Sequence, residues 1–198
     1  MTRILQAVAL VICFCSASLA DDGEGGFSYE PPVVKQQLFG KDVNMLARER
    51  DEYATNLSTY VANQVIEEKA SAESLSAARR ILALAMHLSP RNRQALIVNG
   101  QLRKGVIPQI KKGDYSASVL SRLLLSRSRI LSQAKQPADQ LLARCFVELA
   151  ATIDPRNEDA VFAYEIQRLD FGDVDWDSIT DAKKAPASDT GGTAPDGP

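Results

Sequence analysis

ARRILALAMHLSPRN at residues 78–92 returns 65 positions further on, at residues 143–157, as ARCFVELAATIDPRN. The two copies align without gaps and end in an identical Pro-Arg-Asn. In each copy apolar residues recur with a helical period, the proline cannot extend the helix before it, and the asparagine can cap the helix after it. A repeat of this size indicates helix pairs that bury their apolar faces against neighbouring pairs.

Helical patterning continues on both sides of the repeat, from about residue 43 to residue 170. The composition agrees, because the 11 Gly and 9 Pro fall mostly near the two ends, which favours helices over sheet. We expect six helices separated by breaks at Pro, Gly or Asn. Their expected ranges are 43–68, 73–88, 93–104, 115–134, 138–153 and 158–170.

Small and bulky residues follow one another at fixed intervals in the second helix of each pair. A small residue is followed by a large apolar residue four positions later, by Ala after three more and by Pro after five more. Small residues let two antiparallel helices approach closely, while the bulky residue fills the groove between them. This pattern resembles the second helix of the tetratricopeptide repeat. The residues that carry it are Ala78, Leu82, Ala85 and Pro90 in one copy and Ala143, Val147, Ala150 and Pro155 in the other.

The first helix of that motif is matched less well. Leu96 and Gly100 supply its large and small residues, whereas Tyr164 and Glu165 replace the expected pair of an apolar and a small residue in the last helix. The 65-residue offset is also not twice the 34 residues of the motif. The resemblance therefore covers about residues 50 to 170 as divergent repeats. It implies an all-α fold, a short right-handed α-solenoid of about six antiparallel helices; an unrelated helical bundle with Ala-rich packing is the alternative.

The two ends of the chain differ from this helical body. Residues 1–20 have the apolar core and small terminal residues of a signal peptide, so we expect export to a periplasm or secretion, with no membrane span after cleavage; an uncleaved anchor is the alternative. Residues 21–42 are expected to form an extended leader that contributes nothing to the core, and residues 181–198 a disordered tail. The helical-repeat domain is then 43–180.

The sequence offers no group of residues suited to catalysis. His87 is the only histidine, and near a helix end it is expected to be structural. Cys145 is the only thiol outside the signal peptide and is expected to be buried, with a reactive thiol as the alternative. Asp173, Asp175 and Asp177 alternate as in a calcium loop, but the glycine and distal glutamate of that loop are missing. We therefore expect neither an enzyme nor a cofactor.

Charge is distributed unevenly along the chain. Residues 91–135 hold 10 basic residues and one acidic residue, whereas residues 136–198 hold 5 basic and 13 acidic residues. Three interpretations of the basic centre are open: solvated charge that balances acidic neighbours, an electrostatic site for an acidic protein, anionic polymer or membrane surface, and, least favoured, nucleic-acid binding. The candidate basic patch consists of Arg103, Lys104, Lys111, Lys112, Arg122 and Arg127.

The resemblance also implies a concave binding face lined by the first helix of each pair. We therefore expect a scaffold or adaptor that binds a protein or peptide partner. The rival interpretation is a self-associating structural component of the cell envelope, in which the basic centre of one copy meets the acidic end of the next. The residues expected on the concave face are Gln94, Ile97, Gln101, Lys104, Asp159, Phe162 and Ile166.

An apolar cluster follows the last expected helix. It contains Phe171, Val174, Trp176 and Ile179. A terminal repeat needs a cap, so we expect this segment to cover the exposed end of the solenoid. The alternative is a docking peptide for another protein, because tryptophan is favoured at the centre of interfaces.

Overall fold

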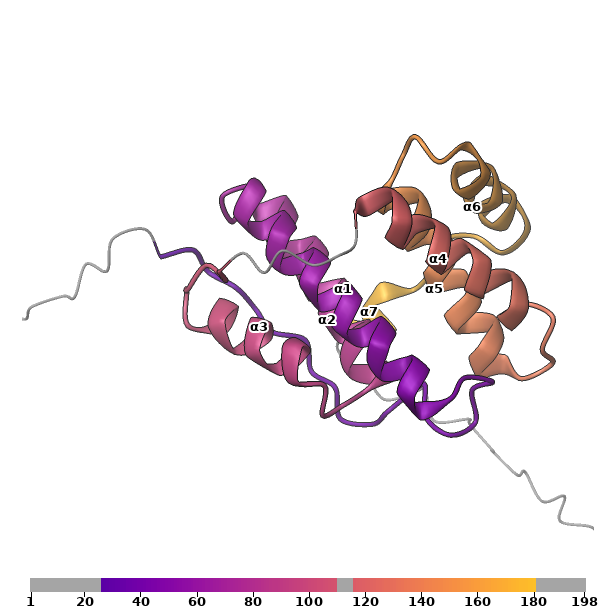
Figure 1. The fold of residues 1–198 in the computed structure, drawn as a ribbon, viewed down its shortest axis with the longest axis horizontal. Coiled ribbons are helices and arrows are strands. Elements are labelled where there is room, and N and C mark those ends of the chain that lie inside the picture. The colour runs from indigo at the N-terminus through magenta and orange to yellow at the C-terminus, as the bar shows by residue number, and fades with distance from the viewer. Residues whose placement is uncertain (1–25, 110–115, 181–198) are drawn as a thin grey trace, which may run out of the picture.

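The computed structural model describes residues 26–109 and 116–180 of the chain (Figure 1). Within these residues the fold is all-helical, as predicted, with seven helices and no strand. The expected signal peptide, the expected tail, and Lys111 and Lys112 lie outside the described residues. The helices are α1 (Ala47–Glu67), α2 (Ala72–Leu88), α3 (Arg93–Arg103), α4 (Ala117–Leu131), α5 (Pro137–Ile153), α6 (Glu158–Phe171) and α7 (Trp176–Thr180).

The first six helices form two units of three. In the first unit α1 packs against α2 and α3, and in the second unit α5 packs against α4 and α6. The ranges of α2 and α5 are offset by 65 residues at both ends, and so are the first residues of α3 and α6. The repeat seen in the sequence is therefore a repeat of helix positions.

The corner between the second and third helices has the same geometry in both units. The residue that ends the second helix is extended in each case: Ser89 has φ −143° and ψ 93°, and Asp154 has φ −135° and ψ 88°. Its carbonyl accepts a 3.0 Å hydrogen bond from the N–H of the following asparagine, Asn92 or Asn157. Each asparagine side chain then caps the third helix, as its position predicted.

The small residues of the repeat lie inside the helix pairs. Ala78, Ala85 and Ala150 are fully buried, and Ala143 is nearly so. The Ser121 hydroxyl on α4 donates a 2.7 Å hydrogen bond to the Ala150 carbonyl on α5, which shows how closely the two helices approach. Of the other packing positions, Leu82 is fully buried, Val147 is half-buried, and Pro90 and Pro155 are exposed in the corners.

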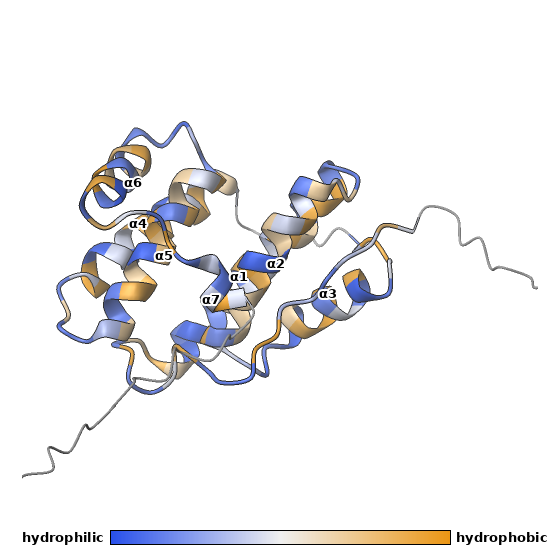
Figure 2. Cartoon of the chain, turned by 180° about the vertical axis from the view of Figure 1, so that it is seen from behind, coloured by the Kyte–Doolittle hydropathy of each residue, from blue (hydrophilic) through white to orange (hydrophobic). Residues whose placement is uncertain are grey.

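The six helices do not stack in one continuous series. Among the described residues, α3 packs against α1 and α2 but not closely against α4, and α3 and α6 lie at opposite ends of the molecule (Figures 1 and 2). Side chains of α1 join the two units instead. The Tyr53 ring stacks on Phe146 of α5, with centroids 5.2 Å apart, and its hydroxyl donates to the Leu123 carbonyl of α4.

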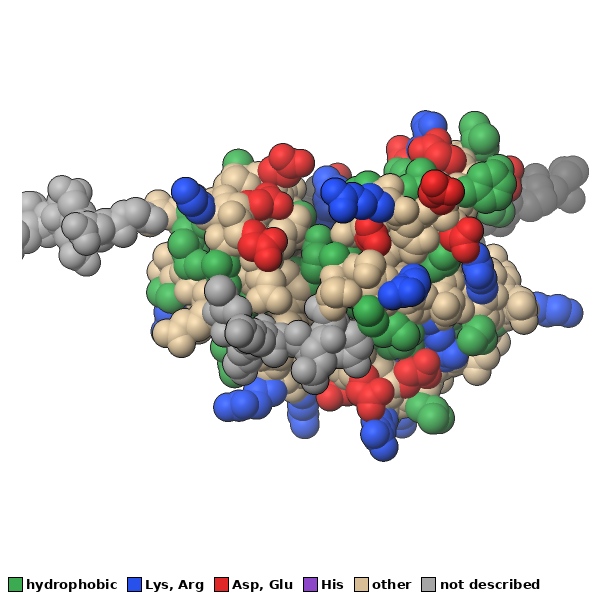
Figure 3. Space-filling view, turned by 45° about the horizontal axis from the view of Figure 1, so that its top comes forward, with side chains coloured by type: hydrophobic (Ala, Val, Ile, Leu, Met, Phe, Trp, Pro, Cys, Tyr) green, Lys and Arg blue, Asp and Glu red, His purple; other side chains and the backbone are tan. Residues whose placement is uncertain are grey.

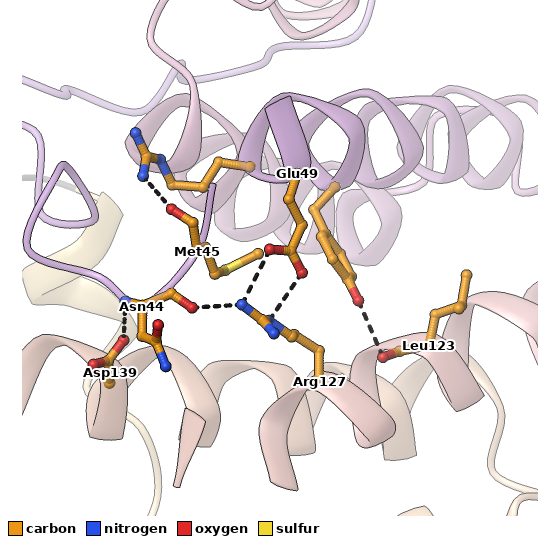
Figure 4. A network of polar contacts seen from close by, with 8 residues as sticks. Asn44, Met45, Glu49, Leu123, Arg127 and Asp139 are labelled. Carbon is orange, nitrogen blue, oxygen red and sulfur yellow. Dashed lines mark hydrogen bonds and ion pairs between the residues drawn. The ribbon is translucent and has the colours of Figure 1, made fainter. Parts of the chain in front are cut away.

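A polar network strengthens the junction of the two units (Figure 4). The Arg127 guanidinium of α4 pairs with the Glu49 carboxylate of α1, with Nε 3.0 Å from Oε1 and Nη2 3.1 Å from Oε2. It also donates to the Asn44 carbonyl. The Asn44 N–H in turn donates a 2.7 Å hydrogen bond to Asp139 at the start of α5. The segment before α1 is thus fixed to both α4 and α5 of the second unit.

The leader enters the core, so the expectation that it would not is wrong. Residues 26–46 form no helix, and α1 begins at Ala47 rather than near residue 43. Phe39 is fully buried, with its ring edge-on to His87 at 6.1 Å. Every residue of α2 from Ile81 to Leu88 is buried. Since α1 and α3 cannot cover a helix that is apolar on so many sides, the extended chain covers part of it.

The C-terminal helix α7 also packs on α2, so the expected cap over the end of the series is not formed. Trp176 and Ile179 are buried, and α7 packs against α2. The Trp176 indole N–H donates a 2.6 Å hydrogen bond to Glu148 of α5. The Val33 N–H of the leader donates to the Thr180 carbonyl at 2.8 Å. The chain therefore returns from the second unit to complete the core of the first.

No described helix combines the length and the apolar character that crossing a bilayer requires.

Candidate binding groove

A groove of about 900 Å³ lies in the second unit between α4 and α6. Because α5 packs against both of these helices, it forms the base of the groove. Both apolar and charged side chains line the groove. The large apolar ones are Leu125, Leu141, Val147, Phe162, Ile166 and Phe171, and the charged ones are Arg129, Lys135, Arg144, Asp159 and Asp170.

The α6 side of the groove exposes large apolar side chains to solvent. Phe162 and Phe171 are 68% and 67% exposed, and Ile166 is 43% exposed. By contrast, α6 buries only Ala160 and Gln167. Isolated exposed apolar residues are common on protein surfaces, but several on one helix beside a groove are typical of an interaction site. Covering them would remove apolar surface from water, which is favourable.

Two arginines shape the groove. Arg129 of α4 reaches across it to Asp159 of α6, with Nη2 3.6 Å from Oδ2, and both side chains are well exposed, so the pair contributes little to stability. The Arg144 Nη2 on α5 donates to the carbonyls of Phe171, Gly172 and Asp173 at 3.0 to 3.3 Å. Its guanidinium carbon also lies 5.7 Å from the centre of the Phe171 ring. Arg144 therefore fixes the chain where it leaves α6.

The turn held by Arg144 depends on a glycine. Gly172 has φ 73°, in the left-handed region that favours glycine, and it ends α6. The residues after Gly172 run back toward α5. The Tyr164 hydroxyl, on α6, donates a 3.1 Å hydrogen bond to the Asp173 carboxylate in this segment. This turn places Phe171 at the rim of the groove.

The corresponding space in the first unit is closed. There α3 packs directly against α1, whereas α6 approaches α4 less closely. The difference is visible at equivalent positions of the repeat: Leu82 on α2 is fully buried, and Val147 on α5 is half-buried and lines the groove. The groove is thus a feature of the second unit, although both units have the same order of helices.

The structure does not bring the seven residues of the expected concave face together. Asp159, Phe162 and Ile166 line the groove, as three neighbours on one helix. The other four, Gln94, Ile97, Gln101 and Lys104, belong to α3 and its C-terminal end, at the far end of the molecule (Figure 1). The physical reason is that α3 does not stack on α4, so α3 and α6 do not share a face.

The expected basic patch is also divided. Arg103 and Lys104 are exposed at the end of α3, and Arg122 is exposed on α4, where its Nε donates to the Ser118 carbonyl. Arg127 faces the opposite way, toward Glu49 of α1, and only 15% of its side chain is exposed. The four described residues therefore form no single cationic surface.

The two residues with reactive side chains lie in the core. His87 is fully buried, with Nδ1 accepting from the Leu38 N–H and Nε2 donating to the Ile179 carbonyl, and burial lowers its pKa. Cys145 is fully buried, and burial raises the pKa of its thiol, which makes the reactive thiolate harder to form. Over the described ranges, no group of three or more His, Cys, Asp or Glu residues is placed to hold a metal ion.

The sequence analysis did not single out Arg144, although the repeat held a clue to its structural role. Arg79 stands at the equivalent position of the first unit, and its Nη2 lies 3.4 Å from the Glu30 carboxylate of the leader. In both units, therefore, the arginine after the packing alanine holds an extended segment against the second helix. The available clue was that both copies carry arginine at this position, one of the two charged residues that they share. Leu125 and Leu141, which also line the groove, gave no such clue.

Comparisons with protein-family models, with curated protein sequences and with solved structures found no match to this chain.

Proposed function

We propose that this protein is a non-catalytic binding module of tetratricopeptide-like design, and that its second unit holds an apolar peptide segment of another protein in the groove between α4 and α6. The observation that carries the proposal is the row of exposed apolar side chains beside this groove, with Phe162 68% exposed. Export by an N-terminal signal peptide, to a periplasm or to the outside of the cell, is part of the same proposal.

Binding would use the apolar and the charged residues differently. Phe162, Ile166 and Leu141 would lose contact with water against apolar side chains of the peptide, which supplies the free energy of binding. Lys135 and Asp170 at the edges would select the orientation of the peptide through charge and hydrogen bonds. A pair such as Arg129 with Asp159 can exchange partners at little cost because both side chains are exposed.

Selection from a random peptide display library tests this proposal without a known partner. The wild type is the bait, and the double variant Phe162→Asp, Ile166→Asp is the counter-bait. Ile130→Asp is a matched control, because Ile130 is an exposed apolar residue of α4 that does not line the groove. Circular dichroism checks that each variant is folded.

The expected result is a set of peptides with spaced apolar residues that bind the wild type and Ile130→Asp but not the double variant. The loss should be large, about tenfold or more for each apolar side chain replaced by a charge, because a buried unpaired carboxylate costs several kcal/mol. The proposal is wrong if no peptide is enriched, or if the enriched peptides bind the double variant as well as the wild type.

A further inference from the structure

The third helices of the two units carry opposite charge. Of the 11 residues of α3, two are arginines and none is acidic, and Lys104 follows directly. In α6 there are four acidic residues and a single basic one, Arg168. The four are Glu158, Asp159, Glu165 and Asp170. The two helices lie at opposite ends of the molecule (Figures 1 and 2), so their opposite charges are far apart.

Along one side of each helix the charged residues differ in sign, although only Arg93 and Glu158 occupy equivalent positions of the repeat. Residues spaced by three and four positions share a helix face. The α3 outer face consists of Arg93, Ile97, Gly100 and Lys104, and the α6 outer face of Glu158, Phe162, Glu165 and Leu169. Position by position, arginine stands opposite glutamate and isoleucine opposite phenylalanine in the two sets.

Both outer faces expose apolar side chains between their charges. On α6, Phe162 is 68% and Leu169 is 76% exposed, and on α3, Ile97 is 36% exposed. Figure 3 shows acidic and apolar side chains next to one another in the upper right of the view, at the end of the molecule that carries α6. Acidic residues predominate on α6 but are not alone, since Arg168 pairs with Glu165 at 2.7 Å, with both side chains about half exposed, so that pair can exchange partners at little cost. Apolar surface beside a predominant charge of one sign fits a partner with apolar surface beside the opposite sign.

Gly100 adds an independent observation. It lies inside α3, where glycine costs about 0.5–1 kcal/mol relative to alanine. A Cβ built at this position meets no atom within 4 Å, so nothing in the fold of the single chain requires glycine there. Glycine allows another surface to approach the helix backbone closely. Its place in the middle of the α3 outer face suits a bulky side chain from a neighbouring molecule.

We propose that copies of this protein associate head to tail, with the α6 outer face of one copy on the α3 outer face of the next. Phe162 of one copy packs over Gly100 and beside Ile97 of its neighbour, and Glu158 and Glu165 approach Arg93 and Lys104. Pairing of identical faces would bring like charges together, which is unfavourable, so a two-fold dimer through either face is disfavoured. A heterologous contact of this kind builds chains or rings rather than closed dimers.

Two charge-reversal variants test the proposal. One is Arg93→Glu with Lys104→Glu, which makes both faces acidic, and the other is Glu158→Lys with Glu165→Lys, which makes both faces basic. All four side chains lie on the surface of the molecule, three exposed and Glu165 half-buried, so both variants should fold, which circular dichroism checks. Sedimentation velocity then gives the average mass of each variant and of their equimolar mixture at low salt.

The wild type is expected to increase in average mass with protein concentration at low salt and to return to the monomer at high salt, because screening weakens exposed ion pairs. Each variant alone should remain monomeric. Their mixture should regain association, at least doubling the average mass, because each acidic face then meets a basic one. The proposal is overturned if the wild type is monomeric at every salt concentration, if a single variant associates like the wild type, or if mixing restores nothing.

Gly100→Leu provides a test that leaves all charges in place. A Cβ at this position meets no atom within 4 Å and leucine has a better helix propensity than glycine, so the variant should fold, which circular dichroism checks. It should nevertheless be monomeric at low salt, because its side chain occupies the place of Phe162 from the neighbour. Undiminished association of a folded Gly100→Leu variant would overturn the proposed contact. Phe162 takes part in both contacts, so peptide binding is compared at high salt and low protein concentration, where the wild type is also monomeric. Under those conditions Gly100→Leu should bind peptide as the wild type does, which separates the two proposals.

Discussion

His87 joins three parts of the chain through one imidazole ring. Its Nδ1 accepts a 3.2 Å hydrogen bond from the Leu38 N–H of the leader, and its Nε2–H donates a 2.8 Å hydrogen bond to the Ile179 carbonyl of α7. These partners require the neutral ring with the proton on Nε2. A second proton would place an N–H of the ring against the N–H of Leu38. Burial also lowers the pKa of His87 below its ordinary value of 6.5.

The stability of the protein should therefore decrease in mild acid. Because the pKa of His87 is lower in the folded state, the unfolded state binds more protons below pH 6.5. The stabilisation is complete above that pH and is lost as the pH falls toward the folded pKa, with a slope of at most about 1.4 kcal/mol per pH unit. Urea unfolding of the wild type and of His87→Gln at several pH values measures this effect. The two stabilities should converge on acidification, and parallel pH profiles would contradict the assignment.

At the level of helices, the sequence predicted what depends on neighbouring residues and missed what depends on distant ones. The prolines and asparagines at residues 90–92 and 155–157 act within their own corners, so the helix ends they predicted agree with the structure. Phe39, in contrast, stands in a segment without periodicity, and its burial depends on how far α2 remains uncovered by α1 and α3. The pattern of residues along the chain does not show how much of α2 its neighbouring helices leave uncovered.

The groove was only partly predictable for the same reason. Asp159, Phe162 and Ile166 were expected at a binding surface because the resemblance to tetratricopeptide repeats implied a concave face lined by this helix, and they do line the groove. Whether α6 lies close to α4 or apart from it depends on the packing of both helices on α5. The first unit has the same helix order and a closed space, so the sequence repeat itself did not distinguish an open unit from a closed one.

The contact between α1 and α4 should be a main source of stability at the junction of the two units. Arg127 and Glu49 are mostly buried, with 15% and 29% of their side chains exposed, and removal of the arginine leaves the carboxylate without its partner. Arg127→Ala should therefore lower the free energy of unfolding by about 2–3 kcal/mol. Arg129→Ala, on the same helix, should change it by no more than about 0.5 kcal/mol, because its pair with Asp159 is exposed. Equal effects of the two substitutions in urea unfolding would contradict this ranking.

Over the whole molecule, Trp176 should report on both units at once. It is the only tryptophan of the chain, it is 7% exposed, and it joins α7, which lies on α2, to Glu148 of α5. Unfolding followed by its fluorescence and by circular dichroism should therefore give the same midpoint. Trp176→Ala should cost about 3 kcal/mol or more, since a large side chain leaves a cavity.

Phe171→Ala is the matched control for that substitution. Phe171 precedes α7 by a few residues but is 67% exposed, so its removal should change stability by about 0.5 kcal/mol or less. Separate midpoints for fluorescence and circular dichroism would mean that the two units unfold independently, in contradiction to the packing of α7.

The return of residues 174–180 to α2 also has a consequence for the order of events during synthesis. The surface of α2 around His87 leaves the ribosome well before residues 174–180, which cover it and are the last of the described helical body to be made. Until those residues emerge, the part of the apolar surface of α2 that α7 later covers stays exposed to solvent. The core around α2 is therefore completed only after residues 174–180 have been made, and until then the nascent chain is a substrate for chaperones and for any machinery that handles extended chains.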